Sequence, residues 1–170
     1  MKIISFLLVN LLLISACNES DEENPCILEN VKAPFVAPCK LTKNMDSVKM
    51  YIQGTWTWLQ EERVQRGQPT KYLTPQTEGV SYMVKLSGDS TISYKCGALT
   101  GKSKFAIVRL KEISGTNFPE DEDPVMVFYD LRTGARTSYV PIVICESYYI
   151  LQYQYVSSVV GPNTWKKITN

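Results

Sequence analysis

The sequence predicts an all-β domain, most economically an antiparallel up-and-down barrel of about eight strands with a short helix before the first strand. The chain of 170 residues contains 10 tyrosines, and aromatic and β-branched residues favour strands. Strand-like runs follow one another along residues 54–168, separated by turns and with no convincing helix between them. A closed barrel leaves no exposed sheet edge. A β-sandwich with the same number of strands is the alternative.

Residues 1–16 have the layout of a secretory signal peptide. Lys2 provides the positive charge, residues 3–14 are almost entirely apolar, and the small residues Ser15 and Ala16 lead to Cys17. A bilayer-spanning helix needs roughly 20 apolar residues, so this run is too short for one. The sequence therefore predicts export and cleavage.

The stretch Ile-Ser-Ala-Cys that ends at Cys17 resembles the lipobox of bacterial lipoproteins. In that family the cysteine thiol receives a diacylglycerol, and the cysteine becomes the first residue of the mature chain. The resemblance implies that acyl chains such as palmitate anchor Cys17 in the outer membrane, with each buried CH₂ contributing about 0.8 kcal/mol. An ordinary signal peptide with an incidental Cys17 is the alternative.

We expect a lipidated tether over residues 17–41 and the folded barrel domain over residues 42–170. Residues 18–25 carry four acidic side chains and no apolar one, and the prolines at positions 25, 34 and 38 oppose regular structure. Acidic residues directly after the lipidated cysteine resemble a signal for display on the cell surface in some Gram-negative bacteria. The periplasmic face of the outer membrane is the alternative.

The composition argues against several function classes. The chain has 18 basic and 17 acidic residues, a net charge of +1 and no cluster of basic side chains, which disfavours nucleic acid as a partner. It has no histidine, so a histidine-based triad or metal cluster is absent, and it contains none of the glycine-rich nucleotide-binding motifs. The acidic run at residues 120–123 does not have the spacing of a calcium loop. We therefore expect no enzyme activity, no cofactor and no metal.

Four cysteines remain after Cys17, namely Cys26, Cys39, Cys96 and Cys145. An even number in an exported chain predicts disulfides, and four cysteines allow three pairings. We expect Cys26–Cys39, which closes a short loop, and Cys96–Cys145, which joins two strands. A zinc site is disfavoured because the chain has neither a histidine nor a CxxC pair.

The elements are expected in the following order. Asn44 is a suitable N-cap for a short helix in which Met45, Val48 and Ile52 share one face, and Gly54 follows close to its end. Eight runs with strand patterns come next, at residues 55–64, 80–86, 91–96, 104–113, 125–131, 138–145, 147–156 and 164–168. The notable loops and turns between them are at residues 71–79, 114–124 and 159–163.

The first strand begins with Gly54, Thr55 and Trp56, the G-x-W arrangement found at the start of the first strand in lipocalins. The short helix before it, the Thr-Pro loop after it and the closing Asn-Thr-Trp-Lys-Lys-Ile are similar to bacterial lipoproteins with a lipocalin-like domain, over residues 44–169. The resemblance implies that Trp56 plugs the closed end of the barrel and that a basic side chain from the last strand packs across it. Lys166 or Lys167 is the candidate, where the family usually has arginine, which stacks better on aromatic rings.

The resemblance also implies that the barrel encloses one small apolar molecule. Alternation along the strands points aromatic side chains into the barrel above Trp56, namely Trp58, Tyr82, Tyr94 and Tyr153. A tyrosine offers an apolar face and a hydroxyl, which suits an amphipathic ligand. The alternative is that these side chains fill the barrel.

These observations predict an outer-membrane lipoprotein, displayed at the cell surface, that binds a small hydrophobic or amphipathic ligand. The alternative function is a filled barrel whose surface or loops bind a protein or a glycan. The two differ in interior volume, because side chains packed at core density leave no room for a ligand, whereas a space of a few hundred Å³ does.

Overall fold

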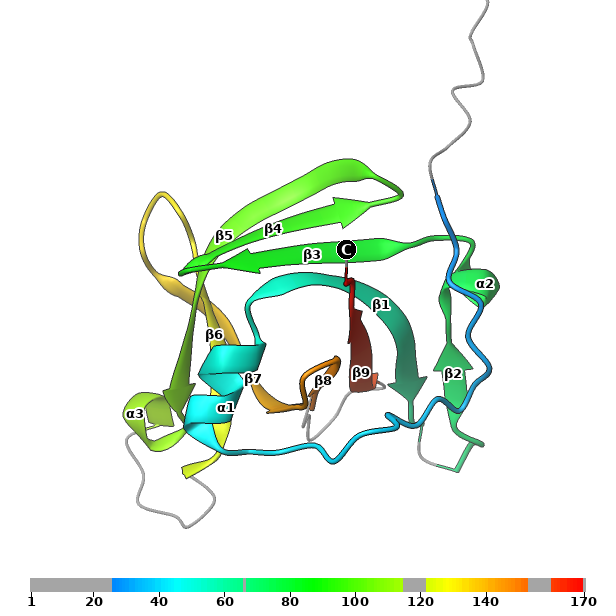
Figure 1. Cartoon of the computed structure of the whole chain (residues 1–170), viewed down its shortest axis with the longest axis horizontal. Coiled ribbons are helices and arrows are strands. Elements are labelled where there is room, and N and C mark those ends of the chain that lie inside the picture. The colour runs from blue at the N-terminus through cyan, green and yellow to red at the C-terminus, as the bar shows by residue number, and fades with distance from the viewer. Residues whose placement is uncertain (1–25, 66, 115–121, 153–159, 170) are drawn as a thin grey trace, which may run out of the picture.

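The computed structural model describes residues 26–65, 67–114, 122–152 and 160–169, which fold around a closed antiparallel β-barrel (Figure 1). Three short helices and nine strands occur in this part of the chain. In chain order they are α1 (Met45–Tyr51), β1 (Gly54–Arg63), β2 (Lys71–Leu73), α2 (Pro75–Glu78), β3 (Tyr82–Ser87), β4 (Ser90–Lys95), β5 (Ala98–Arg109), α3 (Lys111–Ser114), β6 (Pro124–Tyr129), β7 (Arg136–Ile144), β8 (Tyr148–Leu151) and β9 (Val160–Lys167).

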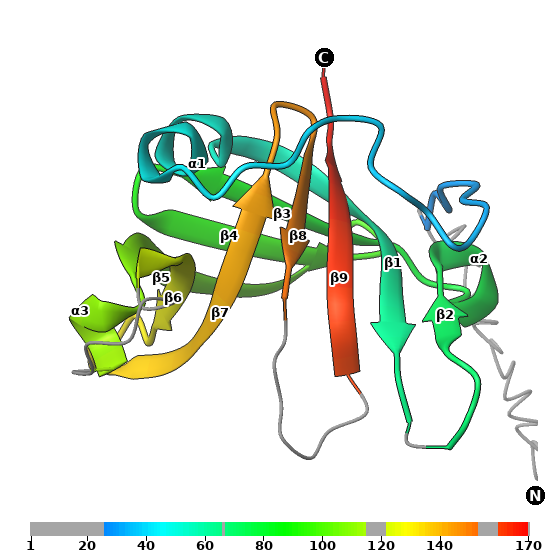
Figure 2. The ribbon, with the colours of Figure 1, turned by 90° about the horizontal axis from the view of Figure 1, so that it is seen from below.

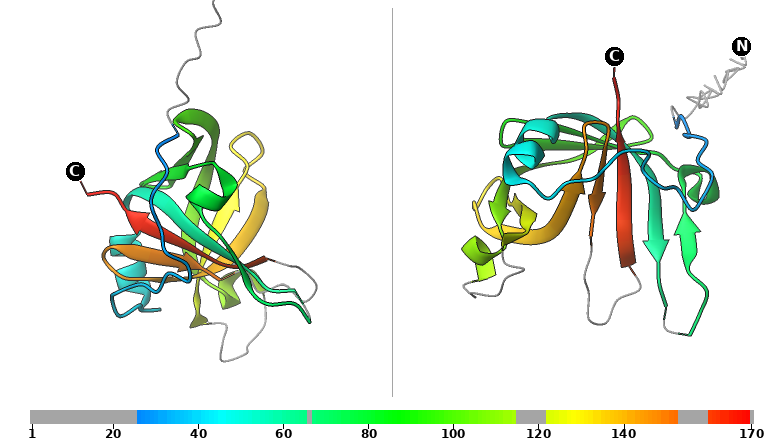
Figure 3. Two further views of the ribbon diagram at one scale, coloured as in Figure 1. Left: turned by 90° about the vertical axis from the view of Figure 1, so that its right-hand side faces the viewer. Right: turned by 60° about the horizontal axis from the view of Figure 1, so that its bottom comes forward.

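Strand β1 closes the barrel because it forms hydrogen bonds along both edges. One edge pairs with β9 from Trp56 to Arg63. The other edge pairs with β3 near the start of β1 and with β2 near its end, so β2 extends the sheet beside the ring of eight strands (Figure 3). The predicted up-and-down barrel is confirmed, and the β1–β9 pairing excludes the sandwich.

Helix α1 has the predicted N-cap and the predicted buried face. The side chain of Asn44 accepts a hydrogen bond from the backbone N–H of Ser47 at 3.0 Å. Val48 and Ile52 are fully buried in the core cluster that also contains Trp56, so the helix covers the core beside this tryptophan. Among the described residues, no helix is long and apolar enough to cross a membrane.

The residues before α1 form an N-terminal strap, residues 26–44, which runs along the outside of the barrel past β1, β9 and β8 (Figure 2). The side-chain amide of Gln60 in β1 accepts a hydrogen bond from the Phe35 backbone N–H at 2.7 Å and donates one to the Phe35 carbonyl at 2.8 Å. The Phe35 ring lies 5.4 Å from the ring of Tyr148 in β8. The described part of the expected tether, residues 26–41, is therefore packed against the barrel.

Two disulfides fix this strap, and their pairing differs from our expectation. Cys26 is bonded to Cys96 in the turn between β4 and β5, and Cys39 is bonded to Cys145 at the end of β7. The expected pairs Cys26–Cys39 and Cys96–Cys145 are wrong because the strap is extended, which carries its two cysteines to different places on the barrel. The involvement of all four cysteines is confirmed.

Strand β9 begins earlier than predicted, at Val160, inside the turn expected at residues 159–163. Gly161 permits this, because a Cβ atom at that position would lie 2.6 Å from the backbone oxygen of Glu62. Only glycine lets the two backbones approach so closely. The Gly-Pro sequence therefore marks a close contact between β9 and β1.

The loop expected at residues 71–79 contains two short regular elements. Strand β2 pairs with the end of β1. Thr74 caps α2 in a capping box with Thr77, and Gly79 ends the helix with a φ of 63°. Elements of three and four residues are too short to show a periodic pattern in the sequence.

We expect the Cys39–Cys145 disulfide to contribute strongly to stability, because its sequence separation is 106 residues against 70 for Cys26–Cys96. Replacing both Cys39 and Cys145 by alanine should lower the free energy of unfolding by about 2–5 kcal/mol, measured by urea denaturation. Peptide mapping of the unchanged protein without reduction should recover the pairs 26/96 and 39/145. A peptide that links Cys26 to Cys39 would contradict the pairing.

Candidate ligand-binding site

The closed end of the lumen is built around Trp56, which is fully buried. The indole N–H of Trp56 donates to the carbonyl of Ile52 at 2.8 Å. Lys167 Nζ lies 5.1 Å from the centre of the indole and donates to the carbonyl of Tyr51 at 3.0 Å. The ammonium group is therefore held over the aromatic ring. Of the two lysines considered from the sequence, Lys167 occupies the basic position, not Lys166.

Gly54 leaves the space through which the lysine side chain passes. Its φ is +136°, and a Cβ atom there would lie 2.7 Å from Lys167 Cε. The side chain of Lys166 is instead paired with the strap, with its Nζ 3.6 Å from Glu29 Oε1. We call the contact between Gly54, Trp56 and Lys167 the barrel floor.

A cavity of ≈ 290 Å³, the lower chamber, lies in the lumen beside the floor. Tyr149 lines it and meets Trp56 with ring centroids 4.7 Å apart. One wall, from β4 and β5, carries the hydroxyl groups of Thr91, Ser93 and Ser103, whose side chains make no hydrogen bond within the described part of the chain. The remaining lining is apolar or aromatic and consists of Val84, Leu86, Met126, Phe128, Tyr149, Leu151 and Trp165.

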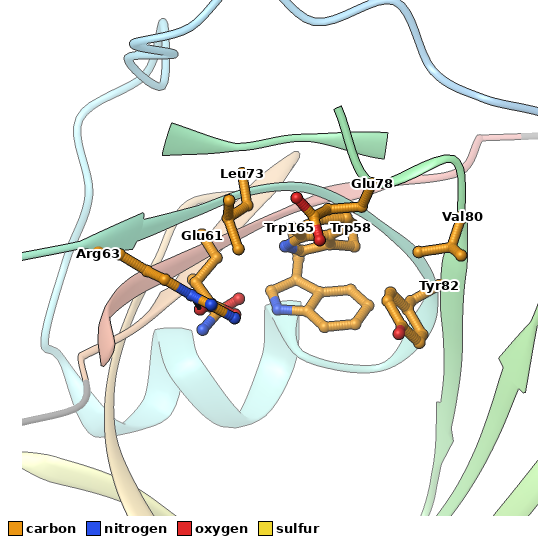
Figure 4. Close-up of a pocket in the computed structure, with 9 residues that line it drawn as sticks. Trp58, Glu61, Arg63, Leu73, Glu78, Val80, Tyr82 and Trp165 are labelled. Atoms are coloured by element: carbon orange, nitrogen blue, oxygen red, sulfur yellow. Dashed lines mark hydrogen bonds and ion pairs between the residues drawn. The ribbon is translucent and has the colours of Figure 1, made fainter. Parts of the chain in front are cut away.

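A second space of ≈ 150 Å³, the mouth chamber, lies toward the end of β1 that is farther from the floor (Figure 4). Three aromatic and three charged side chains dominate its lining. The full set is Trp58, Tyr82, Trp165, Glu61, Arg63, Glu78, Leu73, Val80 and Asn163. Because Trp165 also lines the lower chamber, its indole marks the boundary between the two spaces.

A β-bulge in β1 places a carboxylate in the mouth chamber. The register with β9 shifts between Trp58 and Gln60, which leaves Leu59 as one extra residue in β1. After this shift Glu61 faces the lumen, and Gln60 faces outward to the strap. Strict alternation along β1 would give the opposite arrangement.

Aromatic rings follow the lumen from the mouth to the floor. Trp58 and Tyr82 meet edge to face, with centroids 5.6 Å apart and an interplanar angle of 71°. Trp165 stacks on Tyr149 at 5.8 Å and 11°, and Tyr149 in turn meets Trp56 at the floor. The two chambers therefore share one largely aromatic wall.

The indole N–H of Trp165 is buried and has no hydrogen-bond partner in the part of the chain that the structure describes. A buried donor without an acceptor costs about 1–3 kcal/mol, and such groups are rare in folded proteins. Trp165 is not among the lining residues expected from the sequence. The available signal was its position two residues before Lys167, on the same face of the last strand as the floor lysine.

Two of the four expected lining residues face the lumen. Trp58 and Tyr82 line the mouth chamber. The expectation for Tyr94 is wrong, because its neighbour Ser93 lines the lower chamber and alternation therefore puts Tyr94 on the outer face of β4. Tyr153 lies outside the described residues.

The acidic residues that precede β6 are engaged in ion pairs where the structure describes them. Glu122 pairs with Lys111 and, at 2.8 Å, with Arg109. The hydrogen bond from Lys111 is the main cause that lowers the pKa of Glu122 below its usual value. Asp123 pairs with Lys43. Within the described ranges, no group of three or more metal-binding side chains occurs.

We expect the barrel floor to depend on the fit between Gly54 and the Lys167 side chain. Gly54→Ala should lower the free energy of unfolding by about 2 kcal/mol, because it adds backbone strain and a contact with Lys167 Cε. In a Lys167→Ala background the same change should cost about half as much, since only the backbone strain remains. Urea denaturation of the unchanged protein, the two single variants and the double variant measures both costs.

Lys166→Ala is the matched control, and we expect it to change the free energy of unfolding by less than about 0.5 kcal/mol, since its ion pair with Glu29 is exposed. If Gly54→Ala costs the same with and without Lys167, the lysine side chain does not require the glycine.

The floor has the arrangement that the lipocalin resemblance implies, with a glycine and a tryptophan of the G-x-W motif and a basic side chain of the last strand in contact. Membership of the lipocalin-like lipoproteins stays a prediction. Comparison of the chain with protein-family models, with curated proteins and with solved structures finds no match.

Proposed function

We propose that the protein is a lipoprotein anchored in the outer membrane and displayed at the cell surface, and that its barrel binds one small amphipathic ligand. The observation that carries the binding proposal is the lower chamber, a cavity of ≈ 290 Å³ between a hydroxyl wall and an apolar, aromatic wall. Ligand sites commonly have volumes of about 300–1,000 Å³ and combine apolar surface with a few polar groups. The lower chamber corresponds to the small end of this range.

The volume favours ligand binding over a filled barrel. Side chains that filled the lumen at core density would leave few voids larger than a water molecule, whereas the lower chamber is a half-open pocket that exceeds that size many times. The loop expected to dock a protein or glycan, residues 114–124, lies largely outside the described residues, so no observation there favours the second function.

The polar groups of the lumen favour an amphipathic ligand over a pure hydrocarbon. The hydroxyls of Thr91, Ser93 and Ser103 are available to a ligand in the lower chamber. The unpaired N–H of Trp165 belongs to an indole that borders both chambers. A small rotation of this indole toward a ligand acceptor would offset the cost of the buried donor.

The strap supports an arrangement in which the mouth of the barrel lies near the membrane. The backbone N–H of Ser81 donates to Cys26 Sγ at 3.1 Å, and the neighbours of Ser81, Val80 and Tyr82, line the mouth chamber. Eight residues separate Cys17 from Cys26, so a lipid on Cys17 would lie at most about 30 Å from Cys26 along the chain. An anchor at Cys17 would thus hold the mouth of the barrel near the membrane surface, where amphipathic molecules partition.

Native mass spectrometry of the full chain, purified in detergent from the cells that make it, tests the binding proposal. We expect a reproducible extra mass that is lost on denaturation. The same mass under native and denaturing conditions, together with no uptake of added alkyl compounds, would contradict ligand binding in the lumen.

We expect Ser103→Leu to remove the retained ligand, because leucine would occupy space in the lower chamber. The unfolding temperature should stay unchanged or rise, since the new side chain fills a cavity. Ser87→Leu is the matched control, because Ser87 is exposed on the outer face of β3, and this variant should retain the ligand. Equal ligand content in both variants would exclude the lower chamber as the binding site.

We expect Cys17→Ser to abolish incorporation of labelled palmitate and to release the protein from the membrane fraction. Cys26→Ser is the control, because it removes the disulfide that ties the strap to the β4–β5 turn but leaves the predicted lipidation site. Palmitate labelling that persists in Cys17→Ser would contradict the anchor. Digestion of intact cells by an added protease then distinguishes surface display from the periplasmic face.

A further inference from the structure

The mouth chamber carries a net negative charge. Glu61 and Glu78 contribute two negative charges and Arg63 contributes one positive charge, which leaves −1 among the lining residues. Arg63 Nε lies 2.7 Å from Glu61 Oε1. Glu78 makes no ion pair and no side-chain hydrogen bond within the described ranges, and its charge acts on Arg63 only at longer range than the hydrogen-bonded Glu61 does. The Glu78 carboxylate can therefore contact a ligand cation directly.

The depth of these charges makes the interior of the chamber more negative than the count suggests. The side chain of Glu61 is 18% exposed, whereas that of Arg63 is 45% exposed. A charge farther from water is screened less. A ligand group among the aromatic rings therefore interacts more strongly with the Glu61 carboxylate than with the Arg63 guanidinium.

The aromatic side chains of the chamber are suited to a cation. Trp58 is only 4% exposed, and its ring stands at 71° to that of Tyr82, so the two rings form a corner. Trp165 supplies a third ring (Figure 4). Aromatic faces attract cations through their quadrupole, and tryptophan does so most strongly.

We infer that the mouth chamber binds a cationic head group of the ligand, an alkylammonium nitrogen, while the apolar chain of the same ligand lies in the lower chamber. The inference rests on the proposed binding of a ligand in the lumen and adds the charge of its head group. A chamber of ≈ 150 Å³ suits a compact head group. Trp165 lines both chambers, so a ligand that occupied both would lie against this side chain.

Titration of the full chain with three probes that share an octyl chain, each below its micelle concentration or, for 1-octanol, its solubility limit, tests the inference. The probes are octyltrimethylammonium, octyl sulfate and 1-octanol, and the readout is tryptophan fluorescence checked by calorimetry. We expect octyltrimethylammonium to bind about tenfold more tightly than 1-octanol, and octyl sulfate to bind more weakly than both. All binding should be lost in Ser103→Leu and kept in Ser87→Leu.

The outcomes separate this inference from the proposed function. Equal affinity for the three probes, or tighter binding of octyl sulfate through Arg63, would overturn the cationic head group and leave ligand binding in the lumen intact. If none of the three probes binds, both proposals fail.

Charge variants should change the affinity in opposite directions. The ratio of the affinities for octyltrimethylammonium and 1-octanol should fall about threefold to tenfold in Glu78→Gln, fall further in Glu61→Gln, and rise by a similar factor in Arg63→Gln. Glu62→Gln is the matched control, because Glu62 follows Glu61 on the opposite face of β1 and does not line the chamber. Glu78 and Arg63 are exposed, so their variants are expected to fold. If Glu78→Gln behaves like Glu62→Gln, the inference is overturned.

Discussion

One extra residue in β1, Leu59, determines which side chains the barrel presents inside and outside. Before the bulge, Trp58 faces the lumen by simple alternation. After it, Glu61 faces the mouth chamber and Gln60 faces outward, where its amide binds both backbone polar groups of Phe35. Without the bulge a glutamate would face the strap, and an ionised carboxylate cannot donate the hydrogen bond that the Phe35 carbonyl accepts. The docking of the strap and the placement of the Glu61–Arg63 ion pair in the mouth chamber therefore depend on the same irregularity.

The walls of the lumen are held by backbone pairing around the ring, and part of their lining, such as Leu86 and Met126, also packs in the buried core. The β1–β9 ladder completes the ring, and at its end the Lys167 side chain crosses Gly54 to reach Trp56 and the carboxyl end of α1. A cavity lined by apolar side chains costs stability in proportion to its size. The two disulfides, which close loops with separations of 70 and 106 residues, are suited to offset that cost because they act largely on the unfolded chain.

The fold was predictable from the sequence because it depends on local patterns, such as the Asn44 cap and the alternating strands. The floor was expected only from the resemblance of the G-x-W motif to lipocalins, which left Lys166 and Lys167 as alternatives. The lining was predictable only in part. The alternating residue pattern of β1 does not indicate the bulge at Leu59, so Glu61 could not be assigned to the lumen. Tyr94 was placed inside because apolar residues usually face a core, but the lumen wall of β4 is made of hydroxyl side chains. The disulfide pairing depends on the path of the strap in space, which spacing along the chain does not specify.

The order of charged, aromatic and apolar side chains along the lumen matches the position of the proposed anchor. The strap is fixed beside Ser81, at the end of the barrel where the carboxylates and the Trp58–Tyr82 corner lie. The lower chamber and the floor lie deeper. A ligand that left a membrane at this end would enter with its apolar chain first, because burial of the chain supplies most of the binding free energy. Its polar head would then stop at the mouth, where the Glu78 carboxylate beside the Glu61–Arg63 pair would select among amphipathic molecules by the charge of the head group.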